Sequence, residues 1–149
     1  MLADVMSWTQ ARHPTAISMV ELSTLTGASV VALGESTAAV FANDDGLCRD
    51  VVAAGGKVGE SYWRLPITDE IRESIKATHC DLANINKSRY GGAIEAAAFL
   101  ENFVNKDVKW AHLDIAGPAH TAKEQELLQD GATGFGAGTL MELYRKLAK

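Results

Sequence analysis

The sequence predicts an α/β fold in which helices cover a mixed sheet in a layered α/β/α arrangement. Apolar, β-rich segments alternate along the chain with segments of helical periodicity, as is typical of layered α/β domains. The apolar segments have few polar interruptions, as in strands that are covered on both faces. The chain has 149 residues, of which 47% are apolar, so it can form one hydrophobic core without a metal or a disulfide.

In the first half of the chain, apolar spacing and turn residues predict alternating helices and strands. Pro14 ends the first helix, the polar run 43–45 begins the next one, and Gly55 with Gly56 ends that helix. The expected elements are a helix over 2–13, a strand over 16–22, a turn at 24–27, a β-rich stretch over 30–41 interrupted at 34–36, and a helix over 45–54.

The second half repeats this alternation. Residues before Pro66 are extended, because a residue that precedes proline avoids the helical region, and Thr68 is an expected helix cap. The expected elements are an extended segment over 62–66, helices over 69–76, 91–104 and 139–147, strands over 81–85 and 109–115, and a long loop over 118–138 with a helical turn at 123–129.

Charge and cysteine content narrow the function classes. Lysine and arginine number 14 against 19 aspartates and glutamates, which gives a net charge of −5 and argues against nucleic-acid binding. Cys48 and Cys80 lie far apart, which predicts neither a disulfide nor a structural zinc site and favours the reducing cytoplasm. No apolar run approaches the ~20 residues of a membrane span, so we expect a cytoplasmic protein that does not contact a membrane.

The reactive side chains form no recognisable catalytic machinery. His112 and Asp114 lie two apart on an expected strand and face one side, but two ligands do not make a metal site, so a hydrogen-bonded structural pair is favoured. Residues 79–81 alternate between faces, and Ser36 lacks the second glycine of a nucleophile elbow. The glycine run 134–138 before a helix resembles half of a phosphate-binding loop; a packing loop is favoured, and a nucleotide-binding domain is left as an outside alternative.

Several runs resemble, in order, motifs of the leucyl (cytosol) aminopeptidase family, whose members are hexameric exopeptidases with two metal ions. The resemblance covers essentially the whole chain. The runs are LADV at 2–5, STLTGA at 23–28, YWRLP at 62–66, CDLAN at 80–84, GGAI at 91–94, WAHLDIAG at 110–117 and GATGFG at 131–136.

The resemblance implies that residues 1–149 are the C-terminal portion of a single catalytic domain, beginning just after the family's NTDAEGRL signature. That signature carries two metal ligands and an arginine that holds a bicarbonate, and the remaining ligands lie further upstream. No catalytic or metal-binding residue is therefore expected in this chain. Two Zn²⁺ or Mn²⁺ ions, and the bicarbonate, would be bound by residues outside it. The first helix starts without an N-cap, as a helix cut in its first turns would.

The resemblance implies that this chain forms one wall of the substrate site. It implies that the backbones of Leu25 and Gly27 contact the peptide, that the Leu25 N–H lies near the bicarbonate, and that four small residues line the pocket for the first side chain. Those four are Thr24, Gly27, Ala116 and Ala119. From their own pattern, Thr24 and Gly27 are equally well explained as plain turn residues. Glu21 stands where the family usually has Asp, and we expect Pro118 with Ala119 to change the pocket size.

The function that the resemblance implies is that of one part of an aminopeptidase, which removes leucine-like N-terminal residues from peptides by dinuclear-metal hydrolysis. Its partners would be the missing N-terminal half, the other subunits of a homo-hexamer and peptide substrates, and the chain alone would be inactive. The alternative is a non-catalytic binding or assembly module that retains the pocket and the hexamer-forming surface.

Overall fold

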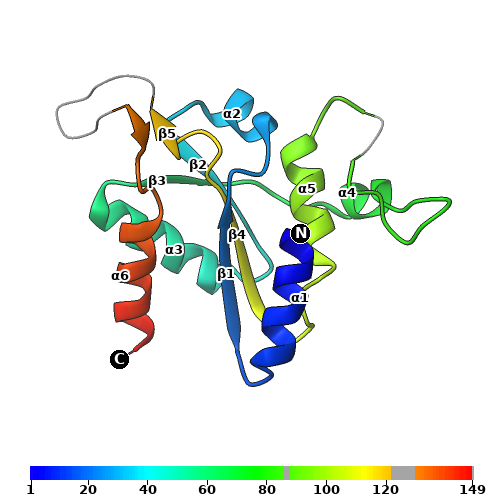
Figure 1. Cartoon of the computed structure of the whole chain (residues 1–149), viewed down its shortest axis with the longest axis horizontal. Helices are drawn as coiled ribbons and strands as arrows, with labels where there is room; N and C mark the ends of the chain where they lie inside the picture. Colours follow the sequence, from blue (N-terminus) through cyan, green and yellow to red (C-terminus); the bar gives the residue numbers. More distant parts are fainter. Residues whose placement is uncertain (86–87, 122–129, 149) are drawn as a thin grey trace.

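The computed structural model describes residues 1–85, 88–121 and 130–148, and its centre is a four-stranded mixed sheet with helices on both faces (Figure 1). The first strand in the sheet runs parallel to its neighbour, the middle pair is antiparallel, and the last pair is parallel. In order across the sheet, the strands are β1 (Ser18–Ser23), β4 (Lys109–Asp114), β2 (Thr37–Ala42) and β3 (Ser61–Arg64). The predicted α/β fold with a mixed sheet is confirmed.

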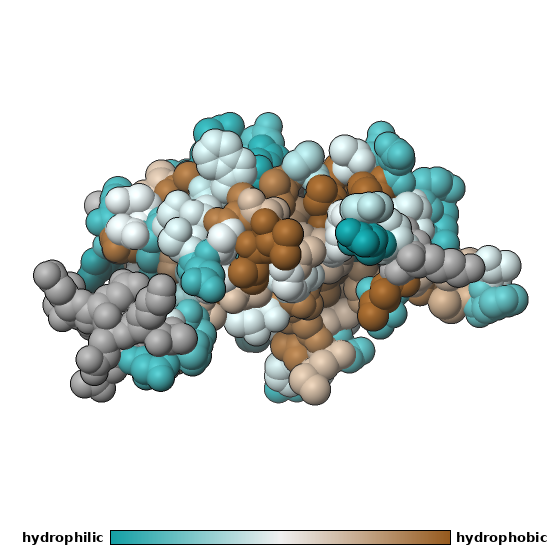
Figure 2. All heavy atoms as spheres, turned by 90° about the horizontal axis from the view of Figure 1, so that it is seen from above, coloured by the Kyte–Doolittle hydropathy of each residue, from teal (hydrophilic) through white to brown (hydrophobic). Residues whose placement is uncertain are grey.

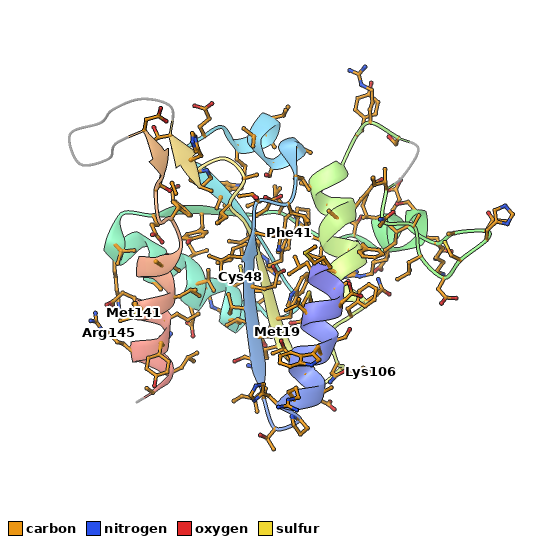
Figure 3. All side chains as sticks on the ribbon, viewed as in Figure 1. Met19, Phe41, Cys48, Lys106, Met141 and Arg145 are labelled. Carbon is orange, nitrogen blue, oxygen red and sulfur yellow. The ribbon has the colours of Figure 1, made fainter. Side chains whose placement is uncertain are left out.

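Helices α3 (Asp45–Val58) and α6 (Ala137–Leu147) cover one face of the sheet (Figure 1). The side chains of Val40, Val51 and Leu113 are fully buried between these helices and the strands. Cys48 of α3 is buried in the same layer, and this burial raises the pKa of its thiol (Figure 3). This face therefore holds a closed apolar core.

Helices α1 (Leu2–Arg12) and α5 (Gly92–Glu101) pack on the other face of the sheet. Phe41 and Trp110 are fully buried there, and Met19 packs against them (Figure 3). The buried Gln10 of α1 donates from Nε2 to the Phe103 carbonyl oxygen at 2.8 Å, which fastens α1 to the segment after α5.

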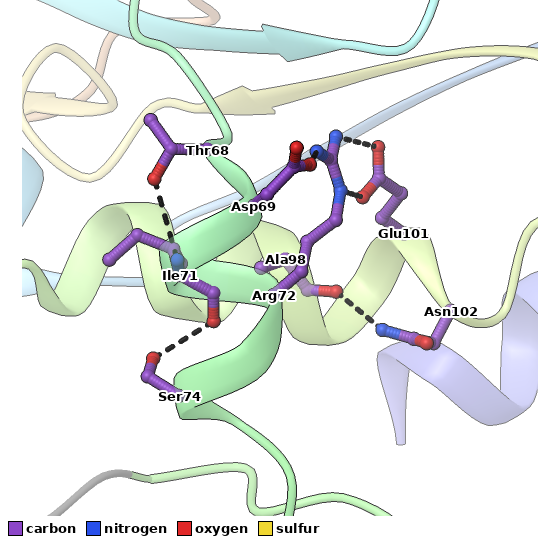
Figure 4. A network of polar contacts seen from close by, with 8 residues as sticks. All are labelled: Thr68, Asp69, Ile71, Arg72, Ser74, Ala98, Glu101 and Asn102. Carbon is purple, nitrogen blue, oxygen red and sulfur yellow. Dashed lines mark hydrogen bonds and ion pairs between the residues drawn. The ribbon is translucent and has the colours of Figure 1, made fainter.

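The short helix α4 (Asp69–Ser74) packs against α5 and is tied to it by charge (Figure 4). Arg72 donates from Nε to Oε2 of Glu101 at 2.7 Å and from Nη1 to Asp69 at 2.8 Å, and the bond to Glu101 raises the pKa of Arg72. The Thr68 hydroxyl accepts from the Ile71 N–H at 3.4 Å, so the predicted cap is confirmed.

The prediction of a β-rich stretch over 30–41 is wrong for its first half. Residues 30–33 belong to helix α2 (Gly27–Leu33), and only the second half forms a strand, β2. The Thr26 hydroxyl caps this helix by accepting from the Ser29 N–H at 3.1 Å, and Gly34 ends it with a φ of 78°. A cap at each end outweighs the strand preference of Val30 and Val31.

The predicted end of the second long helix at Gly55 and Gly56 is also wrong, since α3 continues to Val58. A Cβ on Gly55 would lie 2.4 Å from the Tyr62 ring, so this glycine serves close packing between α3 and β3. The helix ends at Gly59, which has a φ of 78° in the left-handed region that glycine favours.

The remaining differences lie in irregular segments. The predicted strand over 81–85 is wrong, because Leu82 forms only an isolated bridge with Lys76. The predicted loop 118–138 contains a small antiparallel pair, β5 (His120–Thr121) and β6 (Gly131–Ala132), while the predicted helical turn at 123–129 lies outside the described residues. Within the described residues, no helix has the length and apolar character needed to cross a membrane.

Candidate functional site

The two loops that carry the five predicted substrate residues meet at one end of the sheet. β1 and β4 are parallel, with Ser23 paired to Asp114, so their carboxyl ends lie together. Ligands of α/β folds commonly bind at such an end. Thr24, Leu25 and Gly27 follow β1, and Ala116 and Ala119 follow β4. Figure 2 looks onto this end of the molecule and shows apolar atoms gathered over its middle, with hydrophilic residues around them.

The carboxylate of Asp114 joins the two loops. This side chain, at the end of β4, is buried, with 1% of the residue exposed. Its Oδ1 accepts from the N–H groups of Leu25 at 3.1 Å and Ala116 at 3.2 Å. Its Oδ2 accepts from the N–H and the hydroxyl of Thr26, at 3.1 and 2.7 Å. One buried carboxylate therefore contacts both predicted segments.

The first loop is open to its surroundings. Thr24, Leu25 and Gly27 are exposed. A Cβ on Gly27 would meet no described atom within 4 Å, and Gly27 is not among the glycines with positive φ. Neither local packing nor backbone geometry among the described residues therefore explains why this position is glycine.

The second loop is held more tightly. Ala116 and Ala119 are half-buried. A Cβ on Gly117 between them would lie 2.3 Å from the Gly34 carbonyl oxygen, so the loop backbone packs directly on the turn that ends α2. The Ala119 carbonyl oxygen accepts from the Thr133 N–H at 3.1 Å. These contacts fix two small side chains beside the open first loop.

A hollow of about 310 Å³ adjoins the first loop. Leu25 and Thr26 form one wall, and α5 with the segment before it forms the other. Its further lining residues are Asn84, Ile85, Ser88, Gly92, Glu95 and Ala96.

His112 and Asp114, considered above as a metal pair, have separate partners. Nδ1 of the buried His112 lies 2.6 Å from Oε1 of Glu21 on β1, but neither side chain satisfies hydrogen-bond geometry with the described residues, so this is a close contact between an imidazole and a carboxylate. The His112 ring stacks on Phe41 and Trp110, at centroid distances of 5.8 and 6.3 Å. In the described part of the chain, no three His, Cys, Asp or Glu side chains could together hold a metal ion.

The glycine run 134–138 already has an internal carboxylate. Glu60 accepts from the Gly136 N–H through Oε1 at 2.9 Å, and from the N–H and hydroxyl of Thr139 through Oε2. Tyr62 also donates to Glu60, and burial raises the pKa of this tyrosine. Since Glu60 occupies the donors at the start of α6 that a phosphate would need, the structure gives the nucleotide alternative no support.

Sequence reasoning missed Asp114 and Thr26 as the residues that organise this end of the sheet. The signals were available: a Thr three residues before a serine at a helix start, and a carboxylate at the last position of an apolar strand. The pairing between them depends on the parallel contact of β1 with β4, which local pattern does not specify.

The comparisons with known proteins agree with this architecture. Residues 1–141 match the profile of the cytosol aminopeptidase family, catalytic domain. A probable cytosol aminopeptidase of Oleidesulfovibrio alaskensis is 50% identical over 143 residues, which are 96% of this chain and 27% of that protein. A protein of the same description from Persephonella marina is 48% identical over 139 residues, which are 93% of this chain and 28% of that protein.

Solved structures share the fold along nearly the whole chain. The bottromycin maturation enzyme BotP in complex with Mn aligns with a TM-score of 0.92 and 40% identity, covering 99% of this chain and 33% of that one. A mutant of tomato leucine aminopeptidase aligns with a TM-score of 0.88 and 39% identity, covering 97% and 27%. The chain thus spans 27–28% of the two curated relatives named above. With its residues 1–141 matched by the catalytic-domain profile, this chain belongs to the cytosol aminopeptidase family.

Proposed function

We propose that this chain is the C-terminal portion of a metallo-aminopeptidase catalytic domain, the part that follows the ligand-bearing signature. The complete enzyme is proposed to remove leucine-like N-terminal residues from peptides in the cytoplasm. The observation that carries the proposal is the meeting of the two loops, 24–27 and 116–119, at the carboxyl ends of β1 and β4 in a chain that matches this family. The proposed role of the chain is to supply one wall of the peptide site.

The pocket for the first side chain is proposed to involve Thr24, Gly27, Ala116 and Ala119. Small residues on two adjacent loops leave space for an apolar side chain. The open position at Gly27 supports this proposal, because a Cβ there would meet no atom within 4 Å from the described residues beyond its neighbours along the chain. The hollow beside Leu25 offers room for the peptide beyond its first residue.

We propose that the metal ions of the complete enzyme, Mn²⁺ or Zn²⁺, are held by residues outside this chain, as the family resemblance implies. The Mn-containing relative supports a requirement for such ions in the complete protein. When bound, the ions supply Lewis-acid activation of the scissile carbonyl and of water. A bicarbonate near Leu25 would have to share the Leu25 N–H with Asp114, which already accepts from it.

We propose that the rest of the domain joins the sheet at the outer edge of β1, where no strand of the described residues pairs. The carbonyl oxygens of Ile17 and Ser23 accept from N–H groups of the β4 segment, at 3.0 and 2.9 Å. Backbone groups alternate in direction along a strand, so those of Ser18, Val20 and Leu22 face away from β4. A strand from the N-terminal half of the domain would pair with these groups. Assembly into a homo-hexamer is proposed for the complete protein.

The test is a chimaera in which this chain replaces the matching segment of the Oleidesulfovibrio alaskensis relative. We expect the chimaera to hydrolyse Leu-p-nitroanilide with Mn²⁺, and residues 1–149 alone to be inactive under the same conditions. A chimaera that elutes as a folded assembly but does not hydrolyse the substrate would favour the non-catalytic assembly module. Robust hydrolysis by residues 1–149 alone would contradict the proposed division of the site.

The pocket is tested by filling it. In the chimaera, Ala119→Phe should lower kcat/KM for Leu-p-nitroanilide by about 10- to 100-fold, and affect Ala-p-nitroanilide less, because the larger side chain loses more space. The matched control is Ala53→Phe on the exposed side of α3, where we expect both substrates to be hydrolysed as before. Equal losses for both substrates would argue against Ala119 as a pocket residue.

A further inference from the structure

We infer that Asp114 is a positioning residue for the peptide site: its carboxylate fixes the backbone of Leu25 and holds the loop after β1 against the loop after β4. The inference rests on the proposed function only in that these loops must contact the peptide. Asp114 itself is buried, so its effect on a bound peptide passes through the loops.

The position of the carboxylate is set by the sheet. Asp114 and Ser23 are register partners on β4 and β1, so the carboxylate lies level with the last residue of β1, where the first loop begins. The consecutive N–H groups of Leu25 and Thr26 both donate to it. The Ala116 N–H donates to the same oxygen as Leu25, which ties the second loop to the first.

The chemistry of these bonds selects a carboxylate. Four donors converge on its two oxygens, and an ionised aspartate accepts at both of them without carrying a donor. In Asp114→Asn, one oxygen becomes an NH₂ group of the same size. If that group takes the Oδ2 position, it faces the N–H and hydroxyl of Thr26, and if it takes the Oδ1 position, it faces the N–H groups of Leu25 and Ala116. Either orientation places donors against donors, so the loops must move apart.

A small movement of Leu25 has large consequences for a reaction that depends on its backbone, because a misplacement of about 1 Å can cost about 100-fold in rate. Thr26 is the link by which the effect reaches the neighbouring helix, since its hydroxyl donates to Asp114 and accepts from the Ser29 N–H at the start of α2. Asp114 therefore determines where the first loop leaves β1 and how it enters α2.

The first experiment measures kinetics in the chimaera. We expect Asp114→Asn to lower kcat/KM for Leu-p-nitroanilide by about 100-fold, and to weaken binding of a bestatin-like inhibitor. The control is Val51→Ala, a buried change in α3 on the other side of the sheet that leaves both loops untouched. Measured well below its melting temperature, we expect this variant to retain kcat/KM within about threefold of the unsubstituted chimaera.

The second experiment has a readout that does not depend on activity. Hydrogen exchange followed by mass spectrometry should show faster exchange in the peptide that covers residues 23–27 of Asp114→Asn, relative to the same peptide in Val51→Ala. Where Asp114→Asn fails to fold, Thr26→Val removes the hydroxyl bond and Thr26→Ser restores it. We expect Thr26→Val to lose about 10-fold in kcat/KM and Thr26→Ser to recover most of it.

A folded Asp114→Asn variant with unchanged exchange at 23–27 and unchanged kcat/KM would overturn the inference, and so would equal effects of Asp114→Asn and Val51→Ala. If the unsubstituted chimaera is inactive, the proposed function fails, whereas the exchange measurement still decides whether Asp114 holds the loops.

Discussion

Strands β4 and β1 lie side by side and run in the same direction, yet their surroundings differ. In β4, every residue from Trp110 to Asp114 is buried, whereas all six residues of β1 are only half-buried. Each of the two strands has three apolar residues among its six, so β1 is as apolar as β4. β1 therefore has the same apolar content as the interior strand β4, but it lies at the edge of the sheet that the described residues form.

This difference is informative because a strand at the edge of a sheet presents unpaired N–H and C=O groups, with which another strand can pair. Within the described residues, β1 has β4 as its one strand neighbour. In the described part of the chain, α3 and α6 cover one face of the sheet, while no strand pairs with the outer edge of β1. The same edge leads directly into the loop that Asp114 holds, so the open region and the proposed peptide site are continuous.

The largest expected effect comes from a matched pair of leucines across the two strands. Leu113 of β4 and Leu22 of β1 are register partners on the same face, but only Leu113 is fully buried. We expect Leu113→Ala to lower the free energy of unfolding by about 4 kcal/mol and Leu22→Ala by about 2 kcal/mol. The loss of stability grows with the apolar contacts that are removed and with the volume of the cavity that is left. Urea denaturation measures both.

The chimaera sharpens this comparison. If another strand covers β1 in the complete domain, the cost of Leu22→Ala should rise toward that of Leu113→Ala when both are measured there. Equal costs in residues 1–149 alone would show that β1 is as well covered as β4 and would contradict the difference between the strands.

The covered face is tested by two adjacent glycines of α3. A Cβ on Gly55 would press on the Tyr62 ring of β3, whereas one on Gly56 would meet nothing within 4 Å. We expect Gly55→Ala to lower the free energy of unfolding by about 1–3 kcal/mol through overpacking. Gly56→Ala should raise it by about 0.5–1 kcal/mol through helix propensity. Thermal and urea unfolding of the two variants distinguish these signs, and stabilisation by both would show that α3 can move away from β3.

These glycines also show what could be predicted from sequence. The mixed α/β fold and the strands around Val20 and Leu113 follow from local apolar pattern, and the extended segment around Trp63 follows from Pro66; the structure has all three where expected within a few residues. The end of α3 could not be predicted from local pattern, because Gly55 packs against the ring of Tyr62, a residue of the next strand along the chain. The stretch at Val30 failed for a related reason: two caps, rather than side-chain preference, decide α2.

The candidate site divides in the same way. The two loops could be located from the sequence because both follow apolar strands and resemble motifs of one family. The carboxylate that joins them could not, because Asp114 reads locally as a partner of His112, two residues earlier on the same face. Its contact with Leu25 and Thr26 depends on the parallel pairing of β1 with β4, which brings together residues almost 90 positions apart.

The smallest expected effect concerns the helix that covers β4. Asp44 caps α3 by accepting from the Leu47 N–H at 2.7 Å, and this bond holds the pKa of Asp44 below its ordinary value. A lowered pKa means that the capped state is favoured while the carboxylate is ionised. Its contribution is therefore present above about pH 4 and is lost as the pH falls through the lower pKa of the folded protein.

Asp44→Ser separates the cap from the charge. Serine can cap through its hydroxyl but does not titrate, so this variant should keep most of the stability at pH 7 and lose the part of the acid sensitivity that comes from Asp44. Asp44→Ala should lose the cap at every pH. The measurement is the urea midpoint of the three proteins between pH 3 and 7. If the wild-type chain and Asp44→Ser show parallel acid profiles, the ionised carboxylate of Asp44 does not contribute to the acid sensitivity, and only the difference from Asp44→Ala then reports the worth of the cap.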